Sequence, residues 1–259
     1  MDRHAQGHDR RAGDGDAGVK RVAASAASAQ LGLLFLHALP LDGSMWAAQS
    51  HLLPGSTYAP TLYPFGDSVE AWAAAALALA RHDRLVVVGC SVGGSCALEL
   101  AALAPERVAA LVLIGTKARH WPDPALHFLA LRTLREKGME EAWNVFWAPL
   151  FSGSTAHQVI ESGRQMMLRQ SPRDVARGVT AFHTRPSRDG FLPAFSRPVI
   201  VVTGADDIAP GPKMSRTQAE SAPRGRLHVV PDCGHYVPLE RPEALNAILQ
   251  DVIATCGHE

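Results

Sequence analysis

The sequence is poor in aromatic residues and in cysteine, and it has no net charge and no long hydrophobic run. Aromatic residues make up 6% of the 259 positions, and 25 Lys and Arg balance 25 Asp and Glu. A chain without excess positive charge lacks the attraction through which proteins bind nucleic acids and other polyanions. Four cysteines in a chain of this length do not make a disulfide framework, so we expect a cytoplasmic protein.

Sequence signatures of membrane insertion, secretion and metal binding are also missing. The longest nearly apolar stretch, Ala71–Ala80, falls well short of the roughly 20 residues that a membrane-spanning helix needs. The first 18 residues have no apolar centre, which argues against a secretory signal, and they carry four acids, which also argues against a transit peptide. The 12 histidines form no HExxH motif, and no paired CxxC motif occurs. We therefore expect no membrane association, no metal and no cofactor.

The chain does contain short apolar runs that alternate with longer helical stretches, a pattern that predicts a mostly parallel sheet with helices on both faces. Strands are predicted at Leu31–Leu36, Arg84–Val88, Val108–Ile114, Pro198–Thr203 and Arg226–Val230, and Tyr58–Leu62 is a candidate for a short strand. Helices of this α/β core are predicted at Ser44–Leu53, Ser68–Arg81, Gly93–Leu103, Gly211–Ser221 and Pro242–Ala254.

Between Thr116 and Arg197 the alternation stops, and no buried strand is predicted. Helices are expected there at Ala125–Lys137, Met139–Trp147, Ala156–Gln170 and Pro172–His183. We therefore predict an α/β core in residues 31–116 and 198–259, and a helical cap in residues 117–197. Residues 1–30 are predicted to be a disordered tail, in which Val19–Ala23 is a weak candidate for a short edge strand.

The segment Gly89-Cys90-Ser91-Val92-Gly93 joins a predicted strand to a predicted helix. This is the context in which a GxSxG turn exposes a nucleophilic serine, because glycine on both sides relieves the crowding of a tight turn. The string alone is weak evidence, since a surface turn or a nucleotide-binding turn can have the same form. Its position between a strand and a helix favours the nucleophile.

Acidic and histidine candidates follow in the order that a serine triad of this kind requires. Asp206 and Asp207 follow the strand at Pro198–Thr203, and His235 follows the strand at Arg226–Val230. The carboxyl ends of parallel strands are where open α/β sheets place their sites. A serine hydroxyl needs a histidine to remove its proton and a carboxylate to orient that histidine.

With these motifs, the chain resembles serine hydrolases of the α/β-hydrolase fold. Within that superfamily it is similar to small esterases and to proteins like 3-oxoadipate enol-lactonase and the pimeloyl-carrier methyl-ester esterase. The matching stretches are Leu36–Trp46, Pro64–Ser68, Gly89–Gly94, Pro105–Val108, Gly204–Asp207 and Gly234–Glu240.

The resemblance implies a role for several of these residues. The family pattern GxxD favours Asp207 over Asp206 as the triad acid, with Asp206 as a turn residue. The backbone N–H groups of Leu39 and Val92 are expected to form the oxyanion hole, although Ala38 replaces a glycine of the family in the loop before Leu39. His37 is expected to be structural.

We therefore predict a cofactor-independent serine hydrolase that cleaves a small carboxylic ester or lactone through an acyl-enzyme on Ser91. The same triad also serves C–C bond hydrolases, perhydrolases and acyltransferases, and a ligand receptor with negligible turnover is a further alternative. The sequence indicates no oligomeric state.

Two cysteines, the large apolar residues of the predicted cap and four of its basic residues have no firm role from the sequence alone. Cys90 and Cys233 are interpreted as core residues, with a reactive thiol as the alternative. The predicted cap holds aromatic and methionine side chains that form its own core or line an apolar pocket, namely Trp121, Phe128, Trp143, Phe146, Trp147, Phe151, Met166 and Met167. Candidates to bind a substrate carboxylate are Arg119, His120, Arg164 and Arg169.

Overall fold

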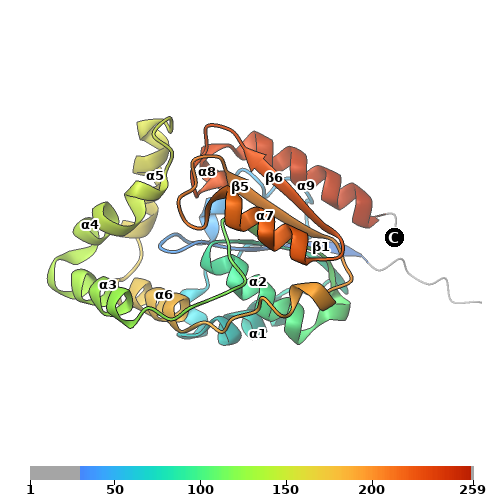
Figure 1. Ribbon diagram of the computed structural model, residues 1–259, viewed down its shortest axis with the longest axis horizontal. Helices are drawn as coiled ribbons and strands as arrows, with labels where there is room; N and C mark the ends of the chain where they lie inside the picture. The colour runs from blue at the N-terminus through green and yellow to red at the C-terminus, as the bar shows by residue number, and fades with distance from the viewer. Residues whose placement is uncertain (1–29, 258–259) are drawn as a thin grey trace, which may run out of the picture.

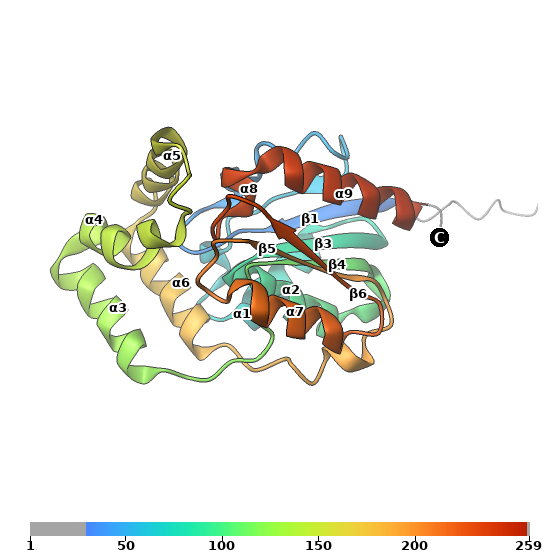
Figure 2. The same ribbon diagram turned by 45° about the horizontal axis from the view of Figure 1, so that its top comes forward.

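The computed structural model describes residues 30–257, and these form a parallel six-stranded sheet with helices on both faces (Figures 1 and 2). The strand order is β2-β1-β3-β4-β5-β6, and every pair of neighbours is parallel. The strands are β1 (Leu31–Leu36), β2 (Thr57–Tyr58), β3 (Arg84–Cys90), β4 (Val108–Ile114), β5 (Val199–Gly204) and β6 (Gly225–Val230). This architecture confirms the predicted fold class.

The central strands are buried along nearly their whole length. Every residue of β4 and β5 is buried, as are the residues of β3 after Arg84. Strands that are covered on both faces have no side chains exposed to solvent, so their sequences are continuous runs of Val and Leu rather than alternating apolar and polar residues. Strand β6 lies at the edge and is mostly partly exposed.

Helices cover both faces of the sheet. On one face lie α1 (Val69–Leu79), α2 (Val92–Leu103) and α7 (Gly211–Ser221), and on the other lies α9 (Pro242–Gly257) (Figure 2). Ser68 begins α1 because its side chain accepts a hydrogen bond from the N–H of Ala71 at 3.2 Å, as an N-terminal cap does.

Between β4 and β5 the chain makes α3 (Pro124–Glu136), α4 (Gly138–Ala142), α5 (His157–Leu168) and α6 (Pro172–Thr184), which extend beyond the end of the sheet (Figure 1). A π-helical turn at Trp143–Trp147 follows α4, so the helix expected at Met139–Trp147 changes its winding part-way. The domain boundaries at residues 116, 117, 197 and 198 stay predictions. The expected tail of residues 1–30 and the candidate strand Val19–Ala23 lie, except for Gln30, outside the described residues.

The helix expected at Ser44–Leu53 was predicted wrongly. The chain there forms only a short 3₁₀ helix, Gly43–Trp46, and then a series of turns. Long-range packing overrides local helix propensity, since Trp46 stacks on Phe35 of β1 with ring centres 4.8 Å apart. The buried Gln49 side chain donates a hydrogen bond to Asn246 of α9 at 3.0 Å. Within residues 30–257, no helix has both the length and the hydropathy needed to cross a membrane.

His37, just after β1, is buried and holds two segments together as a neutral ring. Its Nδ1 donates to the carbonyl of Ala38 at 3.0 Å, and its Nε2 accepts from the N–H of Leu62 at 2.8 Å. Burial lowers the pKa of His37 from 6.5 to about 4, because the charged ring would lose its hydration.

We expect the protein to lose stability in acid through His37. The unfolded chain binds a proton at this residue below pH 6.5, whereas the folded chain binds one only near pH 4. The contribution of the neutral ring to the free energy of unfolding is therefore complete above pH 6.5. As the pH falls from 6.5 to 4, this contribution decreases by on the order of 3 kcal/mol. Urea unfolding at several pH values measures this. The variant His37→Gln should be less stable at pH 7 and show a shallower slope from pH 6.5 to 4, and an unchanged slope would contradict the assignment.

Candidate active site

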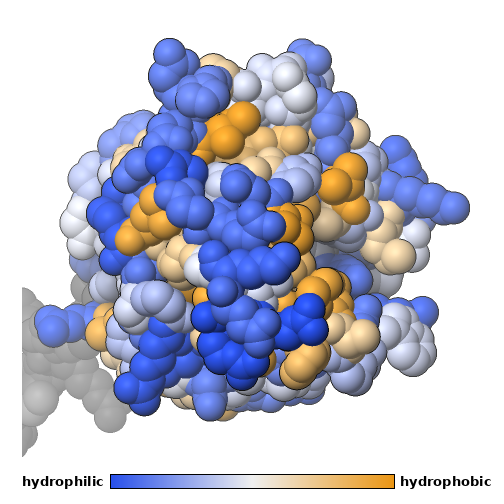
Figure 3. Space-filling model, turned by 90° about the vertical axis from the view of Figure 1, so that its left-hand side faces the viewer, coloured by the Kyte–Doolittle hydropathy of each residue, from blue (hydrophilic) through white to orange (hydrophobic). Residues whose placement is uncertain are grey.

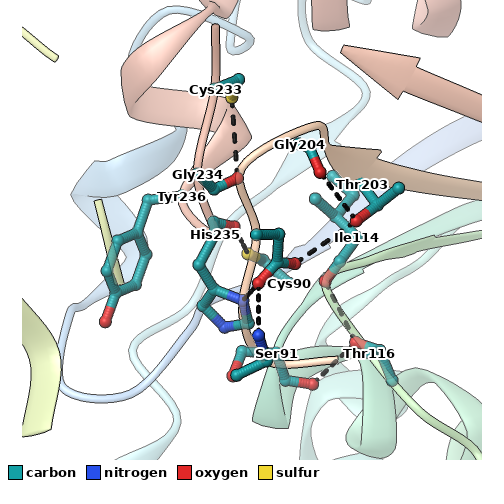
Figure 4. Close-up of polar contacts among 12 residues, drawn as sticks. Cys90, Ser91, Ile114, Thr116, Thr203, Gly204, Cys233, Gly234, His235 and Tyr236 are labelled. Atoms are coloured by element: carbon teal, nitrogen blue, oxygen red, sulfur yellow. Dashed lines mark hydrogen bonds and ion pairs between the residues drawn. The ribbon is translucent and has the colours of Figure 1, made fainter. Parts of the chain in front are cut away.

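Ser91 occupies a sharp turn between β3 and α2. Its backbone has φ of 54° and ψ of −120°, a region that non-glycine residues rarely occupy. A Cβ atom at Gly93 would lie 2.1 Å from the carbonyl oxygen of Leu36, so only glycine allows α2 to approach β1 this closely. The N–H of Ser91 donates to Ile114 at 2.8 Å and its carbonyl accepts from Thr116 Oγ1 at 2.8 Å, which ties the turn to the end of β4 (Figure 4).

His235 is paired with Asp207 at the ends of β6 and β5. Nδ1 of His235 lies 3.1 Å from Oδ1 of Asp207, and both side chains are almost fully buried. Burial raises the pKa of Asp207, but hydrogen bonds and charge from His235, with a bond from the Ala209 N–H, outweigh it and lower that pKa overall. An ionised carboxylate only accepts, so Nδ1 carries the ring proton and Nε2 is the basic nitrogen.

Asp206 makes a different contact. Its Oδ2 accepts a 2.6 Å hydrogen bond from Ser152 Oγ, and its N–H donates to the carbonyl of Cys233. The geometry therefore places Asp207, and not its neighbour, against His235. Asp206 joins the segment before α5 to the loop after β6.

Glu240, at the end of α8 (Val237–Glu240), holds the loop that carries His235 in place. The carboxylate is buried and accepts hydrogen bonds from the backbone N–H groups of Gly234 and Tyr236, each at 2.9 Å. It also accepts from the N–H of Ser152 at 2.9 Å and from Thr155 Oγ1 at 2.5 Å. Sequence reasoning missed this role, because the donors lie on two segments that only the fold brings together.

Ser91 and His235, both labelled in Figure 4, line one cavity of about 450 Å³ at the carboxyl ends of the strands. The walls include Phe146, Trp147 and Val179 from the segment between β4 and β5, so core and helical insertion enclose the space together. Leu39 also lines the cavity.

The N–H groups predicted for the oxyanion hole belong to Leu39, in the loop after β1, and to Val92, the first residue of α2. Neither N–H donates to an acceptor within residues 30–257. Their positions near Ser91 in the fold are compatible with the predicted role, which stays a prediction.

The aromatic and methionine residues singled out in the sequence have different positions. Phe146 and Trp147 line the cavity. Four others are buried within the insertion and are not among the lining residues, namely Trp143, Phe151, Met166 and Met167. Trp121 and Phe128 are 75% and 61% exposed. Figure 3 shows hydrophobic side chains on this end of the molecule separated by hydrophilic ones.

None of the candidates named from the sequence to bind a substrate carboxylate is among the residues that line this cavity. Arg119 pairs with Asp189, and Arg164 pairs with Glu161 and Glu140. His120 contacts the carbonyl of His183, and Arg169 is exposed near Ser44. The cations that do line the cavity are Lys117 and Arg185, which the sequence pattern did not distinguish from the rest.

Cys90 and Cys233 are buried thiols close to the site. Burial raises the pKa of both thiols, which disfavours the reactive thiolate. The structure supports their interpretation as core residues.

Among the described residues, no group of three His, Cys, Asp or Glu side chains is arranged to hold a metal ion.

Gly115, directly after β4, forms the floor under the His235 ring and was not identified from the sequence. Its φ is +54°, and an added Cβ atom would lie 2.8 Å from Nδ1 and Cε1 of His235 and 3.3 Å from Oδ2 of Asp207. A glycine is needed here both for its backbone conformation and for the space that the ring occupies.

The family comparison matches residues 33–248 to the alpha/beta hydrolase family. The chain belongs to this family. A pimeloyl-[acyl-carrier protein] methyl ester esterase of Aromatoleum aromaticum is 28% identical over 259 aligned residues, covering 85% of this chain and 97% of the relative.

Two solved structures share the fold. An esterase of Thermogutta terrifontis, with malate bound, superposes with a TM-score of 0.79 at 29% identity, covering 89% of this chain and 92% of the other. The enol-lactonase of Burkholderia xenovorans LB400 superposes with a TM-score of 0.75, covering 87% and 92%, and at 22% identity it shows the fold alone. The resemblance to small esterases and enol-lactonases is thereby confirmed, and a hydrolase is the class of activity that these relatives support.

We expect Gly115→Ala to damage activity more than folding. The methyl group displaces the His235 ring, and a misplaced base costs roughly tenfold to a hundredfold in kcat. The measurement is kcat for p-nitrophenyl butyrate beside a thermal unfolding curve. Gly138→Ala is the matched control, because Gly138 also has a positive φ, of +86°, but nothing lies within 4 Å of the added methyl. Equal kcat losses in both variants would contradict the role.

We expect Glu240→Gln to destabilise the protein. Each oxygen of the Glu240 carboxylate accepts a hydrogen bond from a backbone N–H. In either orientation of the Gln side chain, its NH₂ group therefore faces one of these N–H donors, and the free energy of unfolding should fall by about 2 kcal/mol. Urea unfolding measures the loss, with Glu243→Gln, an exposed acid in the next helix, as the control. If both variants unfold at the wild-type urea concentration, the contacts of Glu240 do not stabilise the loop.

Proposed function

We propose that this hydrolase cleaves a small carboxylic ester or lactone through an acyl-enzyme on Ser91, with His235 as base and Asp207 as its orienting acid. One observation carries the proposal, namely that His235, held by the buried Asp207, lines the same cavity as Ser91, the serine in the strained turn between β3 and α2. The esterase relatives support this class of substrate.

The proposed reaction begins with attack of Ser91 Oγ on the carbonyl carbon, while Nε2 of His235 accepts the serine proton. The N–H groups of Leu39 and Val92, with the positive end of α2, stabilise the negative oxygen that forms. His235 then gives its proton to the leaving alkoxide. A water molecule, deprotonated by the same ring, attacks the acyl-enzyme and releases the acid.

No residue described here calls for a cofactor in this reaction, and we propose none. We also propose a cytoplasmic location, because Cys90, Cys96 and Cys233 are buried thiols that form no disulfide. The proposed partner is the small-molecule substrate, with no role for nucleic acid or membrane.

We expect Ser91→Ala to lower kcat for p-nitrophenyl butyrate by about a thousandfold or more and to abolish labelling by a fluorophosphonate probe. Ser95→Ala is the control, because this serine also lines the cavity, one turn further along α2, and labelling should persist.

Each outcome distinguishes the proposal from its alternatives. Labelling of Ser91 without ester hydrolysis indicates a C–C bond hydrolase, a perhydrolase or an acyltransferase. Absence of both probe labelling and ester hydrolysis indicates a ligand receptor with negligible turnover. Activity that survives Ser91→Ala overturns the assignment of the nucleophile.

A further inference from the structure

Arg185 is a buried cation on the cavity wall that has no acidic partner among the described residues. It follows α6, where the chain returns toward β5, and only 5% of its surface is exposed. Nη1 donates to the carbonyl of Phe182, and the guanidinium lies 3.9 Å above the centre of the Phe182 ring. Nε is buried and has no hydrogen-bond partner within residues 30–257.

Arg188, three residues later, shows what a paired arginine looks like in the same segment. Its Nε and Nη2 each donate to one oxygen of Glu99 at 2.7 Å, which is the two-pronged geometry that guanidinium and carboxylate groups favour. Arg185 has no such acid. A buried charge without a partner is costly, and burial lowers the pKa of Arg185 to about 10.

A second cation, Lys117, lines the same cavity near Arg185. Burial and the charge of Arg185 both lower the pKa of Lys117. The two residues lie on segments that are bonded together, because Arg188 donates its N–H to Ala118 at 2.8 Å and His120 donates its N–H to Ser187 Oγ at 3.1 Å.

Lys117 also follows Thr116 directly, and the Thr116 hydroxyl donates to the carbonyl of Ser91. The positive charge is therefore part of the cavity that holds the proposed nucleophile, and not of a separate surface.

The end of α6 explains only part of this arrangement. Cations at helix C-termini commonly bond the last carbonyl groups, and the bond from Nη1 to Phe182 is of that kind. That role does not require the guanidinium to line the cavity or Nε to lack a partner. It does not account for Lys117 either.

We propose that Arg185, assisted by Lys117, binds a carboxylate carried by the substrate, so that the substrate is an ester or lactone of a dicarboxylic acid or another acid-bearing compound. The proposal rests on the hydrolase function proposed above and names its substrate class. The substrate's carboxylate supplies the acid that the described chain does not place beside Arg185. A bound carboxylate thereby compensates the charge of Arg185, which is buried and has no acidic partner within residues 30–257.

The first test compares mono-p-nitrophenyl glutarate with p-nitrophenyl pentanoate, two esters whose acyl chains have five carbons and of which only the former has a carboxylate. We expect the wild-type protein to prefer the glutarate ester in kcat/KM. Arg185→Gln should reduce that preference by roughly tenfold to a hundredfold, mainly through KM, and leave the pentanoate ester within about twofold. Arg185→Lys should restore part of the preference.

Arg119→Gln is the matched control. This variant removes one positive charge from the segment that is hydrogen-bonded to the segment of Arg185. Arg119 is exposed, pairs with Asp189 and does not line the cavity. The variant should therefore prefer the glutarate ester as strongly as the wild type does. If Arg185→Gln weakens the hydrolysis of both esters equally, or if the wild type shows no preference, Arg185 is structural and the proposal is wrong.

A binding measurement separates this proposal from the proposed function. Calorimetry on the full-length Ser91→Ala protein should show that free glutarate binds and that the added Arg185→Gln change abolishes the binding. Binding of inorganic phosphate but not of glutarate would overturn the assignment to a carboxylate, and binding of neither would overturn the subsite. If Ser91→Ala retains activity, the nucleophile assignment fails while the glutarate result still decides the role of Arg185.

Discussion

The buried carboxylate of Glu240 is the interaction on which the rest of the site depends. It accepts hydrogen bonds from the residues on either side of His235 and from two residues of the segment before α5. An ionised carboxylate has no proton to offer, so it matches a ring of donors that no neutral side chain of similar size can match. Glu240 therefore fixes the backbone on both sides of His235 and ties it to the segment before α5, while Asp207 orients the ring itself.

The site also shows how the fold distributes buried charge. Asp207 and Glu240 are buried, but each accepts several hydrogen bonds, and the pKa of Asp207 is lowered by the interactions that orient His235. Arg185 is the opposite case, a buried cation whose polar contacts within residues 30–257 are a hydrogen bond to one carbonyl and the face of one aromatic ring. Anionic groups are thus satisfied by the protein itself, whereas the positive charge of the cavity is left for a ligand.

Much of the fold could be predicted because the physics that determines it is local. Strand β4 has the predicted bounds, since a run of apolar, mostly β-branched and leucine residues between a Pro-Glu-Arg turn and a glycine has few alternatives. The triad candidates could be placed because parallel strands bring their carboxyl ends to one edge. Gly115 could not be identified, since its role is a contact with a residue distant in sequence. Glu240 could not be identified either, since local sequence does not show that its carboxylate turns back to the N–H groups of Gly234 and Tyr236 and also meets Ser152. Arg185 could not be chosen among the arginines near it, since it lies after the end of α6, where no helical periodicity indicates which side chains face the core.

The ion pair between Arg188 and Glu99 has a consequence for exchanging parts of this protein with its relatives. Glu99 lies on α2, the helix that begins beside Ser91, whereas Arg188 lies in the returning segment of the insertion. A chimera that replaces only residues 117–187 keeps both partners of this pair. One that extends the exchange to residue 197 transplants a foreign residue opposite Glu99, which is 6% exposed, and leaves that acid without its cation. The practical boundary for modular engineering is thus set by an electrostatic contact rather than by where the helices end.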